Sequence, residues 1–151
     1  MNLIQITNSE HTEIATTLWV KIFPDEPLWV KKYVINDLYR PRIRNARPAQ
    51  PYFIAYHRNK PVGLCGLYKH KGEYWLGWFG VLPEARGDGL GSKMLQALIQ
   101  ELKIRQPRVT ELKLWTEGGR DIQNFYRNHG FKYAGKLVDN LTDARIYRKD
   151  I

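Results

Sequence analysis

The chain has 151 residues, of which 43% are hydrophobic and 26% charged, and we expect residues 1–151 to form a single globular domain. No apolar stretch approaches the ~18 residues that cross a bilayer. The N-terminus also lacks the charged and apolar regions of a signal peptide. We therefore expect a cytoplasmic protein without a membrane partner. The net charge of +9 would suit a nucleic-acid-binding protein, but the charges are spread along the chain and no nucleic-acid-binding motif is present.

Cysteine and histidine usage argues against two kinds of site. The single cysteine, Cys65, lies in an apolar run and cannot form an internal disulfide, so we expect a buried core thiol without a catalytic role. The four histidines lack the spacing of metal ligands, and we expect no metal. Basic residues concentrate in one stretch, which contains Arg40, Arg42, Arg44 and Arg47. Prolines interrupt this stretch, which predicts a loop that is either simply solvated or able to attract an anion.

The first half of the chain predicts two helices between strands. In chain order we expect a strand at 3–6, helices at 9–21 and 25–39, and strands at 52–56 and 62–68. Asn8 or Ser9 is a suitable cap for the first helix, and Pro24 ends it. A turn at 58–60 joins the last two strands into a hairpin.

The second half alternates strands with helices. We expect a strand at 73–82, a helix from Gly89 that ends before Pro107, a strand at 109–116, a helix between 118 and 130, and strands at 131–138 and 144–149. The strand at 73–82 carries apolar residues on both faces, as a strand at the centre of a sheet does. This order of elements predicts an α/β or α+β domain built on one mixed sheet.

Glycine is concentrated between the strand at 73–82 and the helix that follows. Residues 86–92 read Arg-Gly-Asp-Gly-Leu-Gly-Ser, with Gly87, Gly89 and Gly91 at alternate positions. Because glycine has no Cβ, main-chain N–H groups at such a helix start can approach an anion closely. The spacing is neither that of a P-loop nor that of a dinucleotide-binding turn. The loop predicts a phosphate-binding cradle, with a plain glycine-rich turn as the alternative.

The pattern Val81-x-Pro-x-x-Arg-Gly-x-Gly-x-Gly resembles the signature of the GNAT N-acetyltransferases. The predicted order of elements is also that of the family, so the resemblance covers nearly the whole chain. It implies the acyl-CoA N-acyltransferase fold, with a central mixed sheet of about six to seven strands and about four helices. It further implies that acetyl-CoA is the cosubstrate, held by Val81, Arg86, Gly87, Asp88, Gly89, Leu90, Gly91 and Ser92.

A second motif, Asn-Phe-Tyr-Arg-Asn-His-Gly-Phe at 124–131, resembles the closing motif of the family. The resemblance implies that Tyr126 points at the sulfur of CoA and acts as a general acid. By spacing alone, Tyr126 is better explained as a core aromatic residue on one helix face with Ile122 and Phe125, and the catalytic interpretation is favoured only in combination with the glycine loop. Full proton transfer from a tyrosine to a thiol is uphill by about 2 kcal/mol, so Tyr126 would mainly stabilise a developing thiolate by a hydrogen bond.

The general base is less evident. Family members often carry a glutamate four to six residues before the final valine of this strand, where positions 75–77 here hold Trp, Leu and Gly. Glu73 is the nearest carboxylate on that strand, and Glu117 follows the next one; each also suits a solvated strand end. Gly119 stands where many members have an asparagine that contacts CoA. We predict Glu73 as the catalytic carboxylate, with Glu117 or a water chain as alternatives.

These patterns together predict an N-acetyltransferase in which a primary amine of a small molecule or peptide attacks acetyl-CoA directly in a ternary complex. The arginine stretch favours either a small amine that carries a carboxylate or an acidic peptide as the acceptor. The alternative is a non-catalytic basic module that binds RNA or a protein, with CoA as a structural ligand and with Trp75 and Trp78 able to stack on bases. Many relatives pair, so the resemblance also raises a homodimer as an oligomeric state.

Overall fold

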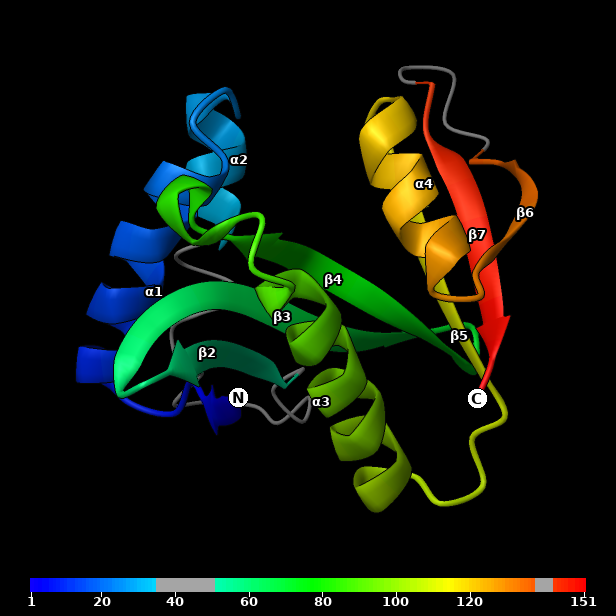
Figure 1. The fold of residues 1–151 in the computed structure, drawn as a ribbon, viewed down its shortest axis with the longest axis horizontal. Helices are drawn as coiled ribbons and strands as arrows, with labels where there is room; N and C mark the ends of the chain where they lie inside the picture. Colours follow the sequence, from blue (N-terminus) through cyan, green and yellow to red (C-terminus); the bar gives the residue numbers. More distant parts are fainter. Residues whose placement is uncertain (35–50, 138–142) are drawn as a thin grey trace.

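A computed structural model describes residues 1–34, 51–137 and 143–151 of the protein (Figure 1). Its elements in chain order are β1 (Asn2–Gln5), α1 (Ser9–Ile22), α2 (Leu28–Tyr33), β2 (Tyr52–His57), β3 (Lys60–His70), β4 (Glu73–Val81), the short 3₁₀ helix η2 (Pro83–Ala85), α3 (Leu90–Arg105), β5 (Glu111–Thr116), α4 (Arg120–Asn128), β6 (Lys132–Lys136) and β7 (Arg145–Asp150). Within these ranges the strands form one sheet in the order β1-β2-β3-β4-β5-β7-β6. The predicted mixed sheet and its alternation with helices are confirmed.

The sheet is antiparallel except at its centre. β4 and β5 run parallel, and each of the other neighbouring pairs is antiparallel. Two-residue turns close both hairpins of β2, β3 and β4, with positive φ at Arg58, Asn59, Lys71 and Gly72. Turns with positive φ at both central residues match the natural twist of a hairpin. The predicted turn after β2 is thereby confirmed.

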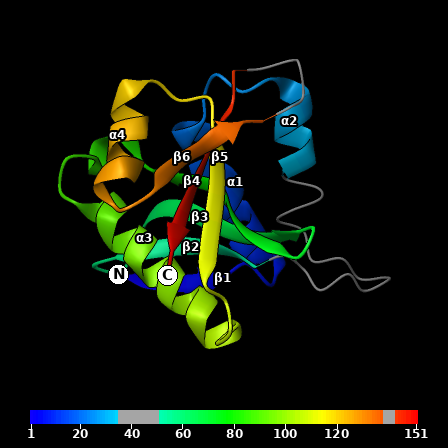
Figure 2. The ribbon, with the colours of Figure 1, turned by 90° about the vertical axis from the view of Figure 1, so that its right-hand side faces the viewer.

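Helices cover the two faces of the sheet in separate pairs. α3 and α4 lie on one face and α1 and α2 on the other, as the two views show (Figures 1 and 2). Alternate residues of β2 divide between the two cores: Phe53 packs with the α3 residues, and Ile54 packs with the α1 residues. Cys65 is fully buried in the α3 core, as expected, and burial raises the pKa of its thiol.

The ends of the first two helices follow local sequence signals. The Asn8 side chain caps α1 by accepting a hydrogen bond from the His11 amide at 2.8 Å, as expected. α2 begins at Leu28 rather than near residue 25. Proline disfavours helical backbone in the residue before it, so Pro27 delays the start. The remainder of that predicted helix and the arginines at 40, 42, 44 and 47 lie outside the described residues.

Considered over the described ranges, the helices are all too short or too polar to cross a membrane.

Candidate functional site

The centre of the sheet opens between β4 and β5. The two strands pair only at Tyr74 with Leu112 and at Trp75 with Lys113, although β4 continues to Val81. In Figure 1 they lie together near the C-terminus and diverge toward α2 and α4. A central strand normally has hydrogen-bond partners on both edges. The second half of β4 therefore presents main-chain donors and acceptors that β5 does not use.

A β-bulge accompanies this divergence. Between two paired positions, Gly66–Gly77 and Leu64–Gly80, β4 advances three residues while β3 advances two. The extra residue falls near Trp78, whose φ of 33° is unusual for a bulky side chain. Its indole packs edge-on against Trp19 and Phe23, with ring centroids 5.6 and 5.2 Å away. Bulges bend a strand and increase its twist, so this one helps to carry β4 away from β5.

The glycine loop lies directly beyond the open end of β4. Gly87 and Gly89 have φ values of 91° and 71°, a region that favours glycine. A Cβ placed on either residue would meet no heavy atom within 4 Å, so the space in front of the loop is open to a ligand. Gly91 differs from these two, because a Cβ there would lie 3.4 Å from the Phe125 ring, at van der Waals contact. This position therefore faces α4 rather than the open space in front of the loop.

The start of α3 offers uncapped N–H groups. The first intrahelical hydrogen bond runs from the Lys93 amide to the Gly89 carbonyl at 3.2 Å, and Gly89 supplies no side-chain cap. Within the described part of the chain, no acceptor lies against the amides of Leu90, Gly91 and Ser92. Free N–H groups at a helix start attract anions. The residues of this loop therefore fit a diphosphate group.

The two charged residues of the loop are both exposed. Arg86 donates from Nε to the Val81 carbonyl oxygen at 3.1 Å and so ties the loop back to the end of β4. One bond uses only one of the five N–H donors of a guanidinium, which leaves its outer edge for an anion. Asp88 carries a negative charge that would repel a phosphate, so only its main chain suits such a ligand.

Tyr126 is held in an aromatic cluster beside this loop. It is 7% exposed, and its ring lies 6.3 Å from Phe79, 5.3 Å from Phe125 and 5.7 Å from Phe131 between centroids. The same buried cluster includes Val81 and Leu90. Burial raises the pKa of the Tyr126 hydroxyl. None of the described side chains forms a hydrogen bond with that hydroxyl. The structure thus gives Tyr126 a core packing role and leaves its hydroxyl available.

Glu73 and Glu117 lie at different ends of the parallel pair. Glu73 begins β4, eight residues before Val81, or roughly 26 Å of extended strand. Its carboxylate pairs with Lys113 at 2.7 Å, a contact that raises the pKa of the lysine. Glu117 follows the end of β5 and therefore lies on the open side. The pKa of Glu26, which lies between α1 and α2, is raised mainly by burial and then by the nearby negative charges of Glu117 and Asp25. The structure does not bring Glu73 to the glycine loop.

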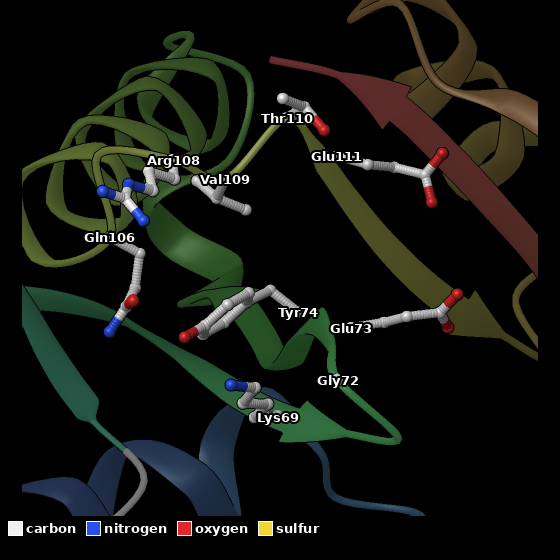
Figure 3. Close-up of a pocket in the computed structure, with 9 residues that line it drawn as sticks. All are labelled: Lys69, Gly72, Glu73, Tyr74, Gln106, Arg108, Val109, Thr110 and Glu111. Atoms are coloured by element: carbon white, nitrogen blue, oxygen red, sulfur yellow. The ribbon is translucent and has the colours of Figure 1, made fainter.

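A polar hollow of about 350 Å³ lies at the closed end of the sheet, where Lys69 and Tyr74 face Gln106 and Arg108 (Figure 3). Its carboxylates are already paired. Glu73 pairs with Lys113, and Glu111 lies 3.1 Å from Arg148, a residue outside the lining. The hollow is remote from the glycine loop. Elsewhere too, the described ranges contain no group of three or more side chains that could hold a metal ion.

Sequence analysis did not identify the bulge at Trp78. A signal was present, because Gly77 and Gly80 interrupt an otherwise bulky strand, and glycine within a strand often marks a bulge or a close approach. A Cβ on Gly80 would lie 2.3 Å from Ile22 of α1, and one on Gly77 would lie 2.5 Å from the Tyr52 hydroxyl. These contacts join distant segments, so only the folded chain reveals them.

Comparisons with known proteins agree with this geometry. The sequence model of the acetyltransferase (GNAT) domain matches residues 48–133. A search of curated protein sequences finds no significant match.

Three solved structures illustrate the similarity of fold. A GNAT family acetyltransferase from Elizabethkingia anophelis with acetyl-CoA bound is 17% identical, with a TM-score of 0.71 over 99% of this chain and 97% of that one. An acetyltransferase from Thermus thermophilus is 16% identical, with a TM-score of 0.75 over 100% and 98%. The PaiA N-acetyltransferase from Thermoplasma acidophilum, in complex with coenzyme A, is 15% identical, with a TM-score of 0.71 over 100% of both chains.

At these identities the solved structures establish the fold, and the domain match, which covers more than half of the chain, establishes the family. The glycine loop, the open centre of the sheet and Tyr126 all lie within the matched segment. The chain belongs to the GNAT family of acetyltransferases, and its enzyme class is that of the acyltransferases.

Proposed function

We propose that the protein transfers an acetyl group from acetyl-CoA to a primary amine of a small molecule or peptide, by direct attack in a ternary complex. One observation carries the proposal: the uncapped N–H groups at the start of α3 lie beside the open centre of the sheet. The structural neighbours that contain acetyl-CoA and coenzyme A support the choice of ligand. Bound acetyl-CoA would supply an acetyl thioester that is already activated for acyl transfer.

In this proposal the glycine loop binds the diphosphate of acetyl-CoA, and β4 orients its acetyl group. The amides of residues 87–92 bind the diphosphate, and Arg86 adds a positive charge at its edge. The main chain near Val81, where β5 provides no partner, donates a hydrogen bond to the acetyl carbonyl oxygen. Fixed dipoles of this kind stabilise the negative charge that develops on a carbonyl oxygen during acyl transfer. Because these groups are main-chain atoms of the fold, they need little reorganisation during the reaction.

Tyr126 acts as a hydrogen-bond donor to the sulfur. Burial raises the pKa of its hydroxyl, so the group stays protonated at every pH at which the enzyme would work. A donor in an apolar environment stabilises a developing thiolate more strongly than one in water. The aromatic rings around Tyr126 provide that environment.

The acceptor amine must lose a proton before it attacks. An alkyl amine with a pKa near 10.4 is neutral in only about one molecule in 2,500 at pH 7. Glu117 is better placed than Glu73 to help, because it lies at the open end of the parallel pair. The neighbouring Glu26 has a raised pKa, and a carboxylate closer to neutral pH is a more effective proton acceptor. We propose Glu117, with Glu26 beside it, as the first candidates for this role.

Isothermal titration calorimetry with acetyl-CoA and with CoA tests the binding step, and a thiol-release assay over a panel of primary amines tests transfer. We expect measurable heat with both ligands and amine-dependent release of CoA. Heat from neither ligand, on folded protein, would contradict the proposal. If RNA then bound with a steep salt dependence, and acetyl-CoA gave no thermal stabilisation, the non-catalytic module would be favoured.

A further inference from the structure

His129 connects the end of α4 to the start of α3. Its Nδ1 lies 2.6 Å from the carbonyl oxygen of Phe125, and its Nε2 lies 2.8 Å from Oγ of Ser92, 37 residues away in the chain. The imidazole also packs on the Phe125 ring, with centroids 4.4 Å apart. Ser92 is in the first turn of α3, next to the uncapped amides, and Tyr126 is one turn before His129. One side chain therefore touches both elements of the proposed site.

The partners of His129 decide where its protons lie. A carbonyl oxygen only accepts, so Nδ1 must carry a proton and donate it to Phe125. When the ring is neutral, Nε2 has a lone pair, and the Ser92 hydroxyl must donate to it. When the ring is an imidazolium, Nε2 donates instead, and Ser92 accepts. The charge on His129 thus determines whether the single hydroxyl proton of Ser92 is free for another acceptor.

We propose that His129 is a positioning residue for the cofactor, which takes up a proton from solvent when an anion binds at the glycine loop and so frees the Ser92 hydroxyl to donate to that anion. This inference rests on the proposed function. The hydroxyl cannot donate to His129 and to a phosphate oxygen at the same time. Uptake of one proton by the ring removes this conflict, and the new positive charge lies close to the negative ligand.

The other charged group that the structure places against His129 is Lys149 of β7. Its Nζ donates to the His129 carbonyl oxygen at 2.6 Å. This contact is made by the main chain of His129 and leaves the two partners of the ring, Phe125 and Ser92, unchanged. Proton uptake is therefore expected to arise from the switch of the Ser92 hydroxyl when the anion binds.

Calorimetry of acetyl-CoA binding from pH 5.5 to 8.5, in buffers that differ in ionisation enthalpy, measures the proton uptake. For the wild type we expect net uptake near neutral pH. The affinity should fall as pH rises through the range in which histidine loses its charge, with a limit of about tenfold per pH unit for one proton. The 3′-phosphate of the ligand titrates equally with every variant, so differences between variants report on the protein.

Three variants distinguish a positioning role of His129 from a role in folding alone. His129→Gln places a neutral amide donor near Ser92, and we expect it to bind acetyl-CoA with a flatter pH profile and no linked uptake. His129→Asn retains a donor for the Phe125 carbonyl but is too short to reach Ser92. Ser92→Ala leaves the α4 contact intact and should also lose the uptake. If one histidine variant does not fold, Ser92→Ala still tests the linkage.

Nuclear magnetic resonance provides a readout that does not depend on activity. On addition of acetyl-CoA at pH 7, the imidazole signals of His129 should move toward those of an imidazolium, with His11, His57 and His70 as internal controls. Binding with the same pH profile in the wild type and in both Ser92→Ala and His129→Gln would overturn the inference and leave the proposed function intact. No binding at any pH would instead overturn the proposed function.

Discussion

The two ends of β4 use their polar groups in opposite ways. At the first end, Tyr74 and Trp75 pair with β5 as well as with β3, and Glu73 is neutralised by Lys113. At the other end, β5 has diverged, Trp78 holds an unusual backbone conformation, and the loop beyond Val81 ends in uncapped amides. One end is closed by its own hydrogen bonds and ion pairs. The other end leaves its main-chain groups for a ligand.

This difference shows why a hollow is not by itself a site. The polar hollow at the closed end has a volume of about 350 Å³, yet its carboxylates are paired within the protein. The open end is defined instead by unmade hydrogen bonds in the middle of a sheet, where such bonds are costly to leave without a partner. A ligand that supplied the missing partners would form hydrogen bonds that the fold itself leaves unmade.

The largest expected effect is the loss of affinity for acetyl-CoA when Gly89 is replaced. We expect Gly89→Val to raise the dissociation constant for acetyl-CoA by about 100-fold or more, the equivalent of about two charge-assisted hydrogen bonds. The new side chain would occupy the open space in front of the loop, where the protein has no atom within 4 Å. Calorimetry measures the affinity, and thermal unfolding measures the cost to stability.

Gly72→Val is the matched control at the closed end. Gly72 also has a positive φ, 80°, and a Cβ there also meets nothing within 4 Å. Both valines therefore carry the same backbone penalty of about 1–2 kcal/mol, but only the one at the loop should affect binding. Equal loss of affinity in the two variants would mean that the loop is not the binding site.

The second effect is on turnover. We expect Tyr126→Phe to lower kcat by about 10- to 100-fold, with little change in the dissociation constant, because the variant keeps the aromatic packing and removes only the hydroxyl. Tyr133→Phe is the control, since Tyr133 lies on β6 and is half exposed. Steady-state kinetics with an identified amine gives the two constants. Unchanged turnover would assign Tyr126 to the core alone.

The smallest expected effect on kcat is that of replacing Glu73. We expect Glu73→Gln to change kcat by less than about twofold and stability by less than about 1 kcal/mol, as for other exposed ion pairs. Glu117→Gln, at the open end, should lower kcat by about tenfold or more if it assists proton removal. The comparison is made at one pH with the same amine. A larger loss in the Glu73 variant than in the Glu117 variant would reverse the assignment of the base.

Local signals in the sequence predicted much of this molecule. The Asn8 cap, the hairpin turn after β2 and the buried Cys65 are confirmed, because each depends on a few neighbouring residues or on an apolar run. The glycine loop could also be found in this way, since it needs positive φ at fixed positions. The roles of the individual site residues stay predictions until the variants are measured.

Other features could not be read from neighbouring residues. Glu73 was predicted because it is the nearest carboxylate on the strand, and nearness in sequence does not tell which end of β4 remains paired to β5. The contact between His129 and Ser92 joins positions 37 residues apart, on two helices that only the folded chain brings together.

By itself, the sequence determined the elements, their order and the glycine-rich loop before α3, because caps, turns and glycines act over a few residues. Only the tertiary structure decided that β4 and β5 diverge, that the hydroxyl of Tyr126 has no partner among the described side chains, and that His129 joins the two helices. The physical reason is that packing and hydrogen bonding between distant segments depend on how the whole sheet twists and bends, which no local pattern encodes.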